Sequence, residues 1–208
     1  MLQYAGSQPL AIDGVTTLLR DSVGKSIFDV ATATLLLLLV APLFAVIAAA
    51  VKLTSPGTVF YRQTRVGRGK RQFPMLKFRS MVANADRIGP WYTEENDLRV
   101  TWVGRVLRSA SLDELPQLIN VIRGEMSLVG PRPPVPTQLA DYTEEDRRIL
   151  FSVKPGITGL AQVMGRSSLP VEARTNYSIH YALHRTMLMD LGILARTAWA
   201  VVTRQGTN

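Results

Sequence analysis

The chain has 208 residues, no cysteine, two histidines and a formal net charge of +8. This length leaves room for a membrane segment and one compact domain of about 150 residues. The absence of cysteine excludes a disulfide framework and any Cys-ligated metal site. His180 and His184 are too few for a metal site made of histidines alone.

Residues 1–24 have a mixed, partly polar composition, and we expect them to form an N-terminal leader. The uncharged apolar run Val30–Val51 follows, and a helix that crosses a bilayer needs roughly 20 such residues. Basic residues stand on both sides of the run, and Lys and Arg favour the cytoplasmic side of a membrane. Pro42 breaks the run because proline removes a helix hydrogen bond. Two interpretations stay open: a kinked transmembrane helix, or a re-entrant segment with both ends cytoplasmic.

Positive charge gathers directly after the apolar run. Residues 52–79 contain eight Lys or Arg and no Asp or Glu, which equals the whole excess of the chain. A basic stretch joined to an apolar run is typical of a surface that binds anionic lipids or phosphate groups. Nucleic-acid binding is the competing interpretation of a high positive charge, but the sequence has no recognised nucleic-acid-binding motif.

Periodicity and turn residues predict the remaining elements in chain order. We expect a helix over Phe28–Leu53 that bends near Ala41–Pro42, strands over Val59–Gln63 and Phe73–Phe78, helices over Thr101–Arg108, Leu112–Arg123, Thr143–Phe151 and Met187–Thr203, and loops over Gly130–Pro136 and Lys154–Gly159. The apolar stripe of the last helix suits either packing on the core or a membrane interface.

The acidic segment Ser111–Pro116 has two interpretations. Local physics favours a helix cap, either with Ser111 at the N-cap and Glu114 completing a capping box, or with Asp113 at the N-cap so that Pro116 falls in the first turn. Alternatively, the adjacent carboxylates of Asp113 and Glu114 form an anionic centre. Such a centre can hold a divalent metal through oxygen ligands or supply a carboxylate nucleophile.

Several cations are candidates for phosphate binding. Arg132 lies in a proline-rich loop, and a guanidinium held in this way suits bidentate recognition of phosphate. Arg105 and Arg108 lie three residues apart on one helix face, and Lys77 and Arg79 alternate on the second strand. Each has a simpler interpretation as well. The helix and loop arginines suit a solvated surface, and Lys77 and Arg79 suit contact with lipid headgroups.

Long motifs in a fixed order run from about Lys25 to Thr197. They are Lys25-Ser26-Ile27-Phe28-Asp29, Ser55-Pro56-Gly57, Gln63-Thr64-Arg65-Val66-Gly67, Lys77-Phe78-Arg79-Ser80-Met81, Ser111-Leu112-Asp113-Glu114-Leu115-Pro116-Gln117, Gly124-Glu125-Met126-Ser127-Leu128-Val129-Gly130-Pro131-Arg132-Pro133 and Lys154-Pro155-Gly156-Ile157-Thr158-Gly159-Leu160-Ala161-Gln162-Val163. This pattern resembles the bacterial sugar transferases, which are monotopic polyprenyl-phosphate phosphoglycosyl transferases, over nearly the whole chain.

The resemblance implies an α/β, membrane-associated (monotopic) fold. Residues 25–53 would form a re-entrant membrane helix broken at Pro42, and residues 54–208 a small cytoplasmic catalytic domain with short strands and interfacial amphipathic helices. The implied reaction moves a sugar-1-phosphate from a UDP-sugar to polyprenyl (undecaprenyl) phosphate and releases UMP. It is the first membrane step of bacterial exopolysaccharide, O-antigen or glycoconjugate synthesis, at the cytoplasmic face of the inner membrane.

The resemblance also implies roles for single residues. The Asp-Glu dyad of the family maps onto Asp113 and Glu114, with Asp113 as the nucleophile of a phosphosugar-aspartate intermediate and both residues as Mg²⁺ ligands. The residues expected to bind substrate phosphate are Arg108, Arg132, Lys77 and Arg79. The expected partners are the UDP-sugar donor, polyprenyl phosphate, anionic membrane lipids and, in a homodimer, a second copy of the chain, but not nucleic acid.

Two positions depart from the family pattern: Ser26 replaces a usual basic residue, and Ser178 replaces a usual Asp. Neither change touches the dyad. Two functions of other classes compete with catalysis. One is a membrane-anchored scaffold in which the acidic pair only caps a helix. The other is a peripheral nucleic-acid binder, whose attachment would weaken steeply with salt.

Overall fold

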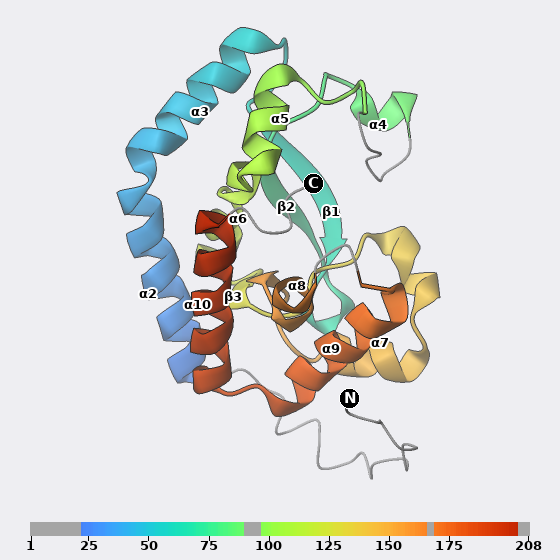
Figure 1. Cartoon of the computed structure of the whole chain (residues 1–208). Coiled ribbons are helices and arrows are strands. Elements are labelled where there is room, and N and C mark those ends of the chain that lie inside the picture. The colour runs from blue at the N-terminus through green and yellow to red at the C-terminus, as the bar shows by residue number, and fades with distance from the viewer. Residues whose placement is uncertain (1–21, 90–96, 166–168, 204–208) are drawn as a thin grey trace.

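The computed structural model describes residues 22–89, 97–165 and 169–203, and the leader expected over residues 1–24 lies almost entirely outside them. Figure 1 shows the arrangement of the elements in space. In chain order they are α2 (Val23–Leu39), α3 (Ala41–Thr54), β1 (Phe60–Val66), the 3₁₀ turn η1 (Arg68–Lys70), β2 (Gln72–Phe78), α4 (Ala85–Ile88), α5 (Trp102–Ser109), η2 (Leu112–Glu114), α6 (Gln117–Ile122), β3 (Ser127–Val129), η3 (Pro136–Asp141), α7 (Glu144–Leu150), β4 (Gly156–Thr158), α8 (Leu160–Met164), α9 (Val171–His184) and α10 (Met187–Val202).

The apolar run forms two helices, α2 and α3, that meet at a bend of 65° (Figure 1). Within the described residues no single helix has the length and composition to cross a membrane, whereas this bent pair, taken together, has the character of a broken span or a re-entrant loop. Pro42 lies in the first turn of α3. The N–H groups of a first turn have no carbonyl partner within their own helix, so the missing N–H of this proline removes no hydrogen bond from α3. The bend expected at this proline is confirmed, and the re-entrant topology stays a prediction.

The hairpin β1–β2 packs its aromatic side chains against α3. The strands are antiparallel with Phe60 opposite Phe78, and the ring of Phe44 from α3 lies 4.6 Å from that of Phe78 between centroids. Both strands were expected from their alternation, and each is longer than predicted. The connection passes through Gly69, whose φ of 67° suits a residue without a Cβ.

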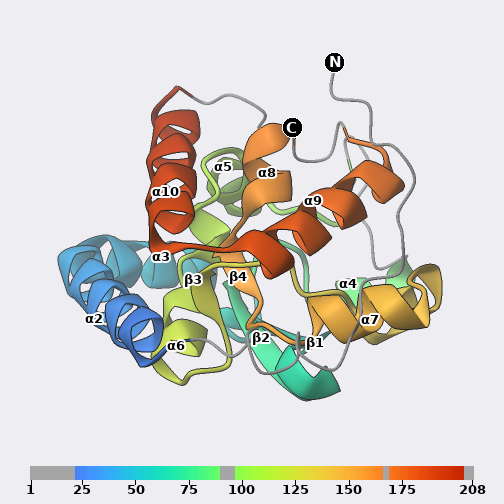
Figure 2. The ribbon, with the colours of Figure 1, turned by 90° about the horizontal axis from the view of Figure 1, so that it is seen from below.

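Two short strands, β3 and β4, form a parallel pair at the centre of the domain (Figure 2). Ser127 pairs with Gly156 and Val129 with Thr158. The loop predicted over Lys154–Gly159 is therefore wrong for its central residues. A Cβ on Gly156 would overlap the backbone of Gly130, so this pairing depends on glycine. The loop predicted over Gly130–Pro136 is confirmed as far as Val135. It carries Arg132 and follows directly after β3, a strand that was not predicted.

The last helix, α10, packs on the core and also carries exposed apolar side chains, and its contact with a membrane interface stays a prediction. Ile193 is buried in the main apolar core with residues of α2, β2, α6 and β3. Leu188, Leu191 and Trp199 of the same helix are exposed. Figure 1 shows α10 running beside α2.

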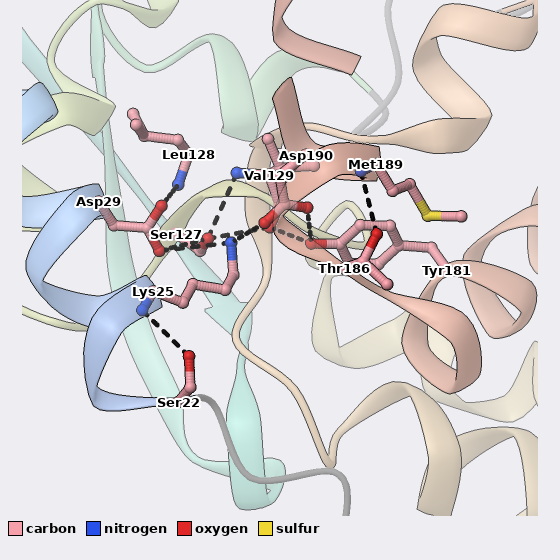
Figure 3. Close-up of polar contacts among 10 residues, drawn as sticks. All are labelled: Ser22, Lys25, Asp29, Ser127, Leu128, Val129, Tyr181, Thr186, Met189 and Asp190. Atoms are coloured by element: carbon pink, nitrogen blue, oxygen red, sulfur yellow. Dashed lines mark hydrogen bonds and ion pairs between the residues drawn. The ribbon is translucent and has the colours of Figure 1, made fainter. Parts of the chain in front are cut away.

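A buried polar group, here called the Lys25 cluster, joins α2, β3, α9 and α10 (Figure 3). It consists of Lys25, Asp29, Ser127, Tyr181 and Asp190. The Lys25 ammonium donates to Asp190 Oδ2 at 2.7 Å and lies 3.5 Å from Asp29 Oδ2. Asp29 Oδ2 also accepts from Ser127 at 2.7 Å, and Asp190 Oδ1 lies 2.7 Å from the Tyr181 hydroxyl. The cluster thus fixes β3, which leads into the loop that carries Arg132, against α2.

Candidate active site

Asp113 and Glu114 lie in the 3₁₀ turn η2, not at a helix cap. Ser111 has a φ of 55° and makes no capping hydrogen bond, and the residue at the N-cap position of α6 is Pro116, also without a side-chain cap. Both capping interpretations are therefore wrong. So is the continuous helix predicted over 112–123, because Pro116 has no N–H with which to join η2 to α6.

Glu114 is held by two cations from different elements. Its Oε1 accepts from Lys77 Nζ of β2 at 2.8 Å and from Arg132 Nη2 of the proline-rich loop at 3.3 Å. Burial alone would raise the pKa of this carboxyl, but Lys77 and Arg132 hold the pKa of Glu114 well below its usual range. Glu114 is therefore ionised at neutral pH and fixed in position by both cations.

Asp113 has a different environment although it is the adjacent residue. It is 6% exposed, and its carboxylate accepts no hydrogen bond from any side chain or backbone group in the part of the chain that the structure describes. Burial raises the pKa of Asp113, while Lys77 lowers it and the Glu114 charge raises it further. A buried carboxylate without a hydrogen-bonding partner suits a group that interacts with a ligand.

A cavity of about 1200 Å³ brings these residues together. Its polar lining includes Lys77, Arg108, Asp113, Glu114 and Arg132. Its wall also includes Leu36 and Val40, which lie at the bend between α2 and α3. The charged dyad and the apolar helix break therefore face one continuous space, large enough for a substrate of drug size or above.

The four predicted phosphate-binding cations occupy different positions. Lys77 and Arg132 bind Glu114, and Arg108 is near enough to Asp113 to lower the pKa of that carboxyl. Arg79 also lines the cavity, but its guanidinium donates to the carbonyls of Ser55 at 2.7 Å and Pro56 at 2.9 Å. Those carbonyls follow the C-terminus of α3, so Arg79 holds the hairpin against the end of the bent helix pair. Its role in phosphate binding stays a prediction.

Sequence reasoning did not single out Arg65, which also lines the cavity. Arg65 lies on β1 and is buried. It donates to Gln63, two residues earlier on the same strand, and to the carbonyl of Pro133, next to Arg132. The alternation of the strand could have indicated the pairing of Gln63 with Arg65, because side chains two residues apart on a strand point to the same face.

The residues present fit a magnesium ion only in part. In the described ranges, no group of three or more His, Cys, Asp and Glu side chains is placed to hold a metal ion. Mg²⁺ is usually bound through one or two carboxylates together with substrate phosphates and water. Asp113 and Glu114 match that pattern as a pair of adjacent carboxylates on a cavity, with the remaining ligands left to substrate and water.

Comparison with known proteins gives the family of the chain. The profile of a family described as "Bacterial sugar transferase" matches residues 20–204. The exopolysaccharide production protein ExoY of Rhizobium meliloti is 41% identical in an alignment of 222 positions that covers 98% of this chain and 97% of the relative. A UDP-glucose:undecaprenyl-phosphate glucose-1-phosphate transferase of Caulobacter vibrioides is 41% identical over 86% of this chain and 70% of the relative. An undecaprenyl-phosphate galactose phosphotransferase of Salmonella typhimurium is 39% identical over 88% of this chain and 41% of the relative. The chain belongs to the bacterial sugar transferase family.

Proposed function

We propose that this protein transfers a sugar-1-phosphate from a UDP-sugar to undecaprenyl phosphate and releases UMP. The observation that carries the proposal is the Asp113 carboxylate, which is buried, faces the cavity and lies beside a glutamate already held by two cations. The names of the relatives support both the donor class and the acceptor, and the ExoY relatives support a role in exopolysaccharide production.

In the proposed mechanism Asp113 is a covalent nucleophile. A carboxylate oxygen attacks the β-phosphorus of the UDP-sugar, and the bond from that phosphorus to the bridging oxygen breaks, so that UMP leaves. An oxygen of undecaprenyl phosphate then attacks the same phosphorus, and the bond to Asp113 breaks. The carboxylate is regenerated, and splitting the reaction in this way lets a soluble and a lipid substrate use one site in turn.

Glu114, Lys77 and Arg132 would act on charge and geometry. Two cations within 3.3 Å of Glu114 Oε1 form a rigid group next to Asp113. Cations preorganised in a partly buried site stabilise negative charge that develops on a transferring phosphoryl group. A Mg²⁺ ion bound by the dyad would neutralise charge on the diphosphate. Arg108, which lines the same cavity, supplies a further positive charge near Asp113.

The lipid acceptor also accounts for the composition of the cavity wall. Leu36 and Val40 bring the apolar helix break to the same space as the dyad. An acceptor whose phosphate reaches the dyad can then keep its hydrocarbon chain in the apolar surface of α2 and α3. We propose that the chain lies on the cytoplasmic face of the inner membrane, with the basic residues after α3 on anionic lipid headgroups.

Two measurements test this function. UMP release is measured with Mg²⁺ and undecaprenyl phosphate over UDP-glucose, UDP-galactose and UDP-N-acetylgalactosamine, the donors that the names of relatives indicate. Intact-protein mass spectrometry with UDP-sugar but no lipid should then detect one added phosphosugar. Asp113→Asn should lose both the adduct and at least about a thousandfold in turnover.

The matched control is Asp146→Asn, which removes a carboxylate of the α7 capping box that is not part of the cavity lining. This variant should keep both the adduct and the turnover. An active Asp113→Asn enzyme, or an adduct mapped to another residue, would end the assignment. No UMP release with any donor, from a protein that is folded and bound to membranes, would favour the scaffold interpretation.

A further inference from the structure

Arg65 is a buried cation whose partners are all neutral. It is 8% exposed. Its Nη1 donates to the Pro133 carbonyl at 2.8 Å, and its Nε and Nη2 donate to Gln63 Oε1 at 3.0 and 2.6 Å. No carboxylate in the described part of the chain forms an ion pair with it. Buried charges in proteins are normally paired, so this guanidinium lacks the partner that its burial calls for.

The hydrogen bonds of Arg65 within the described residues leave some of its N–H donors for a ligand. A guanidinium has five N–H donors in a planar fork. The contacts with Gln63 and Pro133 occupy the Nε–H and one N–H on each Nη nitrogen, so the second N–H of each Nη has no acceptor among the described residues. Arg65 and Arg132 both line the cavity, and they are joined through Pro133, which follows Arg132 in the chain.

The net effect of the surroundings opposes the charge of Arg65. Burial and the neighbouring Arg132 lower the pKa of Arg65 to about 10, and the Glu114 charge offsets only part of that effect, so the group stays charged at neutral pH and the two guanidinium groups repel each other. A neutral side chain with N–H donors would be enough to bind the Pro133 carbonyl and Gln63 Oε1. The positive charge of Arg65 becomes favourable only when an anion lies in the space that Arg65 and Arg132 both line.

We propose that Arg65 and Arg132 form a two-arginine site that binds a phosphate group of a substrate. This inference rests on the proposed function, which supplies two sources for that chemistry: the diphosphate of the UDP-sugar and the phosphate of undecaprenyl phosphate. Arg65 is oriented by Gln63 on its own strand and in turn holds the loop of Arg132, so both guanidinium groups are positioned before the ligand arrives.

The test compares Arg65→Gln, which removes the charge, with Arg65→Lys, which keeps it but loses the fork. Arg62→Gln is the matched control, because Arg62 lies on the same strand but is exposed and outside the cavity lining. Thermal unfolding establishes that each variant is folded. Binding of inorganic pyrophosphate by calorimetry needs no turnover, so it tests the site even if the proposed function fails.

We expect Arg65→Gln to weaken pyrophosphate binding by about tenfold or more, since hydrogen bonds to charged groups contribute on this scale. Arg65→Lys should recover part of the loss, and Arg62→Gln should bind like the wild type. Steady-state kinetics identify the source of the phosphate. A raised KM for the UDP-sugar points to the diphosphate, and a raised KM for undecaprenyl phosphate points to the lipid.

Two results would overturn the proposal. In the first, wild type and Arg65→Gln bind pyrophosphate equally, or neither binds it. In the second, Arg65→Gln and Arg65→Lys lower kcat to the same extent with both KM values unchanged, which would mean that Arg65 only holds the loop of Arg132. Loss of UMP release in every variant and in the wild type would instead reject the proposed function, with the calorimetric result still deciding the anion site.

Discussion

Two groups in this chain each combine a pair of carboxylates with a lysine. They differ in whether both carboxylates have hydrogen-bond partners within the protein. In the Lys25 cluster both oxygens of Asp29 and both oxygens of Asp190 have a partner within the protein. In the second group, here called the Glu114 cluster (Lys77, Asp113, Glu114 and Arg132), the cations bind only Glu114.

The difference separates structural from functional use of the same residue types. A buried polar group with every partner present stabilises one arrangement of the chain. A buried carboxylate without a hydrogen bond is unfavourable until a ligand or cation reaches it, so it is retained for what it binds. The Lys25 cluster joins α2 to elements distant in sequence, whereas Asp113 faces a cavity.

The largest change in stability is expected for Lys25→Met. The substitution leaves the carboxylates of Asp29 and Asp190 buried without their cation. Removal of one partner of a buried ion pair destabilises by about 3 to 5 kcal/mol. Urea unfolding of the detergent-solubilised protein measures the loss. The double variant Lys25→Met with Asp190→Asn should recover part of it, and equal stability of the single and double variants would mean that the charges are not coupled.

The equivalent substitution in the Glu114 cluster, Lys77→Met, should cost little stability but much turnover. Glu114 keeps Arg132 as a partner and its side chain is 21% exposed, so we expect a loss of about 1 kcal/mol in stability. Turnover should fall by about a hundredfold, because a preorganised cation is removed from the site of phosphoryl transfer. A Lys77→Met enzyme with normal kcat would show that Lys77 is only a structural partner of Glu114.

The carboxylates of the Glu114 cluster should also respond to pH in opposite senses. Lys77 and Arg132 lower the pKa of Glu114 against the effect of burial, so its contribution to stability is present above the ordinary glutamate value of 4.5 and is lost as the pH falls below it. Burial raises the pKa of Asp113 above 3.8, so its ionisation in the folded protein is unfavourable, and stability from this group increases as the pH falls.

For catalysis only the ionised form of Asp113 is a nucleophile, so UMP release should fall at acid pH with a midpoint above 3.8. Because Lys77 lowers the pKa of Asp113, the residual activity of Lys77→Met should have its acid limb at higher pH than the wild type. The pH profile of kcat/KM measures both effects. An acid limb that moves to lower pH in this variant would contradict the assignment of Asp113.

Sequence reasoning predicted features that depend on neighbours in the chain. The bend at Pro42, the alternating strands of the hairpin and the helix predicted over Thr101–Arg108 follow from local chemistry. The structure has all three, with the helix at Trp102–Ser109. The motif order also indicated Asp113 and Glu114 as a functional pair, and the structure places them at a cavity with Lys77, Arg108 and Arg132.

The features that sequence reasoning missed depend on long-range contacts. Strands β3 and β4 have three residues each, and only their pairing across the chain makes them strands. Lys25 meets Asp190 across 165 positions, which no local pattern can indicate. The positive φ of Ser111 contradicts the preference of a serine for the N-cap. At that position tertiary context overrides local propensity, and it does so next to Asp113 and Glu114.

The smallest and most direct test applies one substitution, Asp→Asn, to both clusters. In Asp190→Asn the Lys25 ammonium loses its closest anionic partner, at 2.7 Å, so the free energy of unfolding should decrease. In Asp113→Asn a buried carboxylate with a raised pKa and no hydrogen bond from the described residues becomes neutral, so the free energy of unfolding should increase. A gain on the order of 1 kcal/mol is typical when a functional residue is replaced by one that suits its surroundings better. Urea unfolding at neutral pH measures both variants side by side. A loss of stability in Asp113→Asn as large as in Asp190→Asn would mean that Asp113 is a structural carboxylate like Asp190, and the distinction between the two clusters would fail.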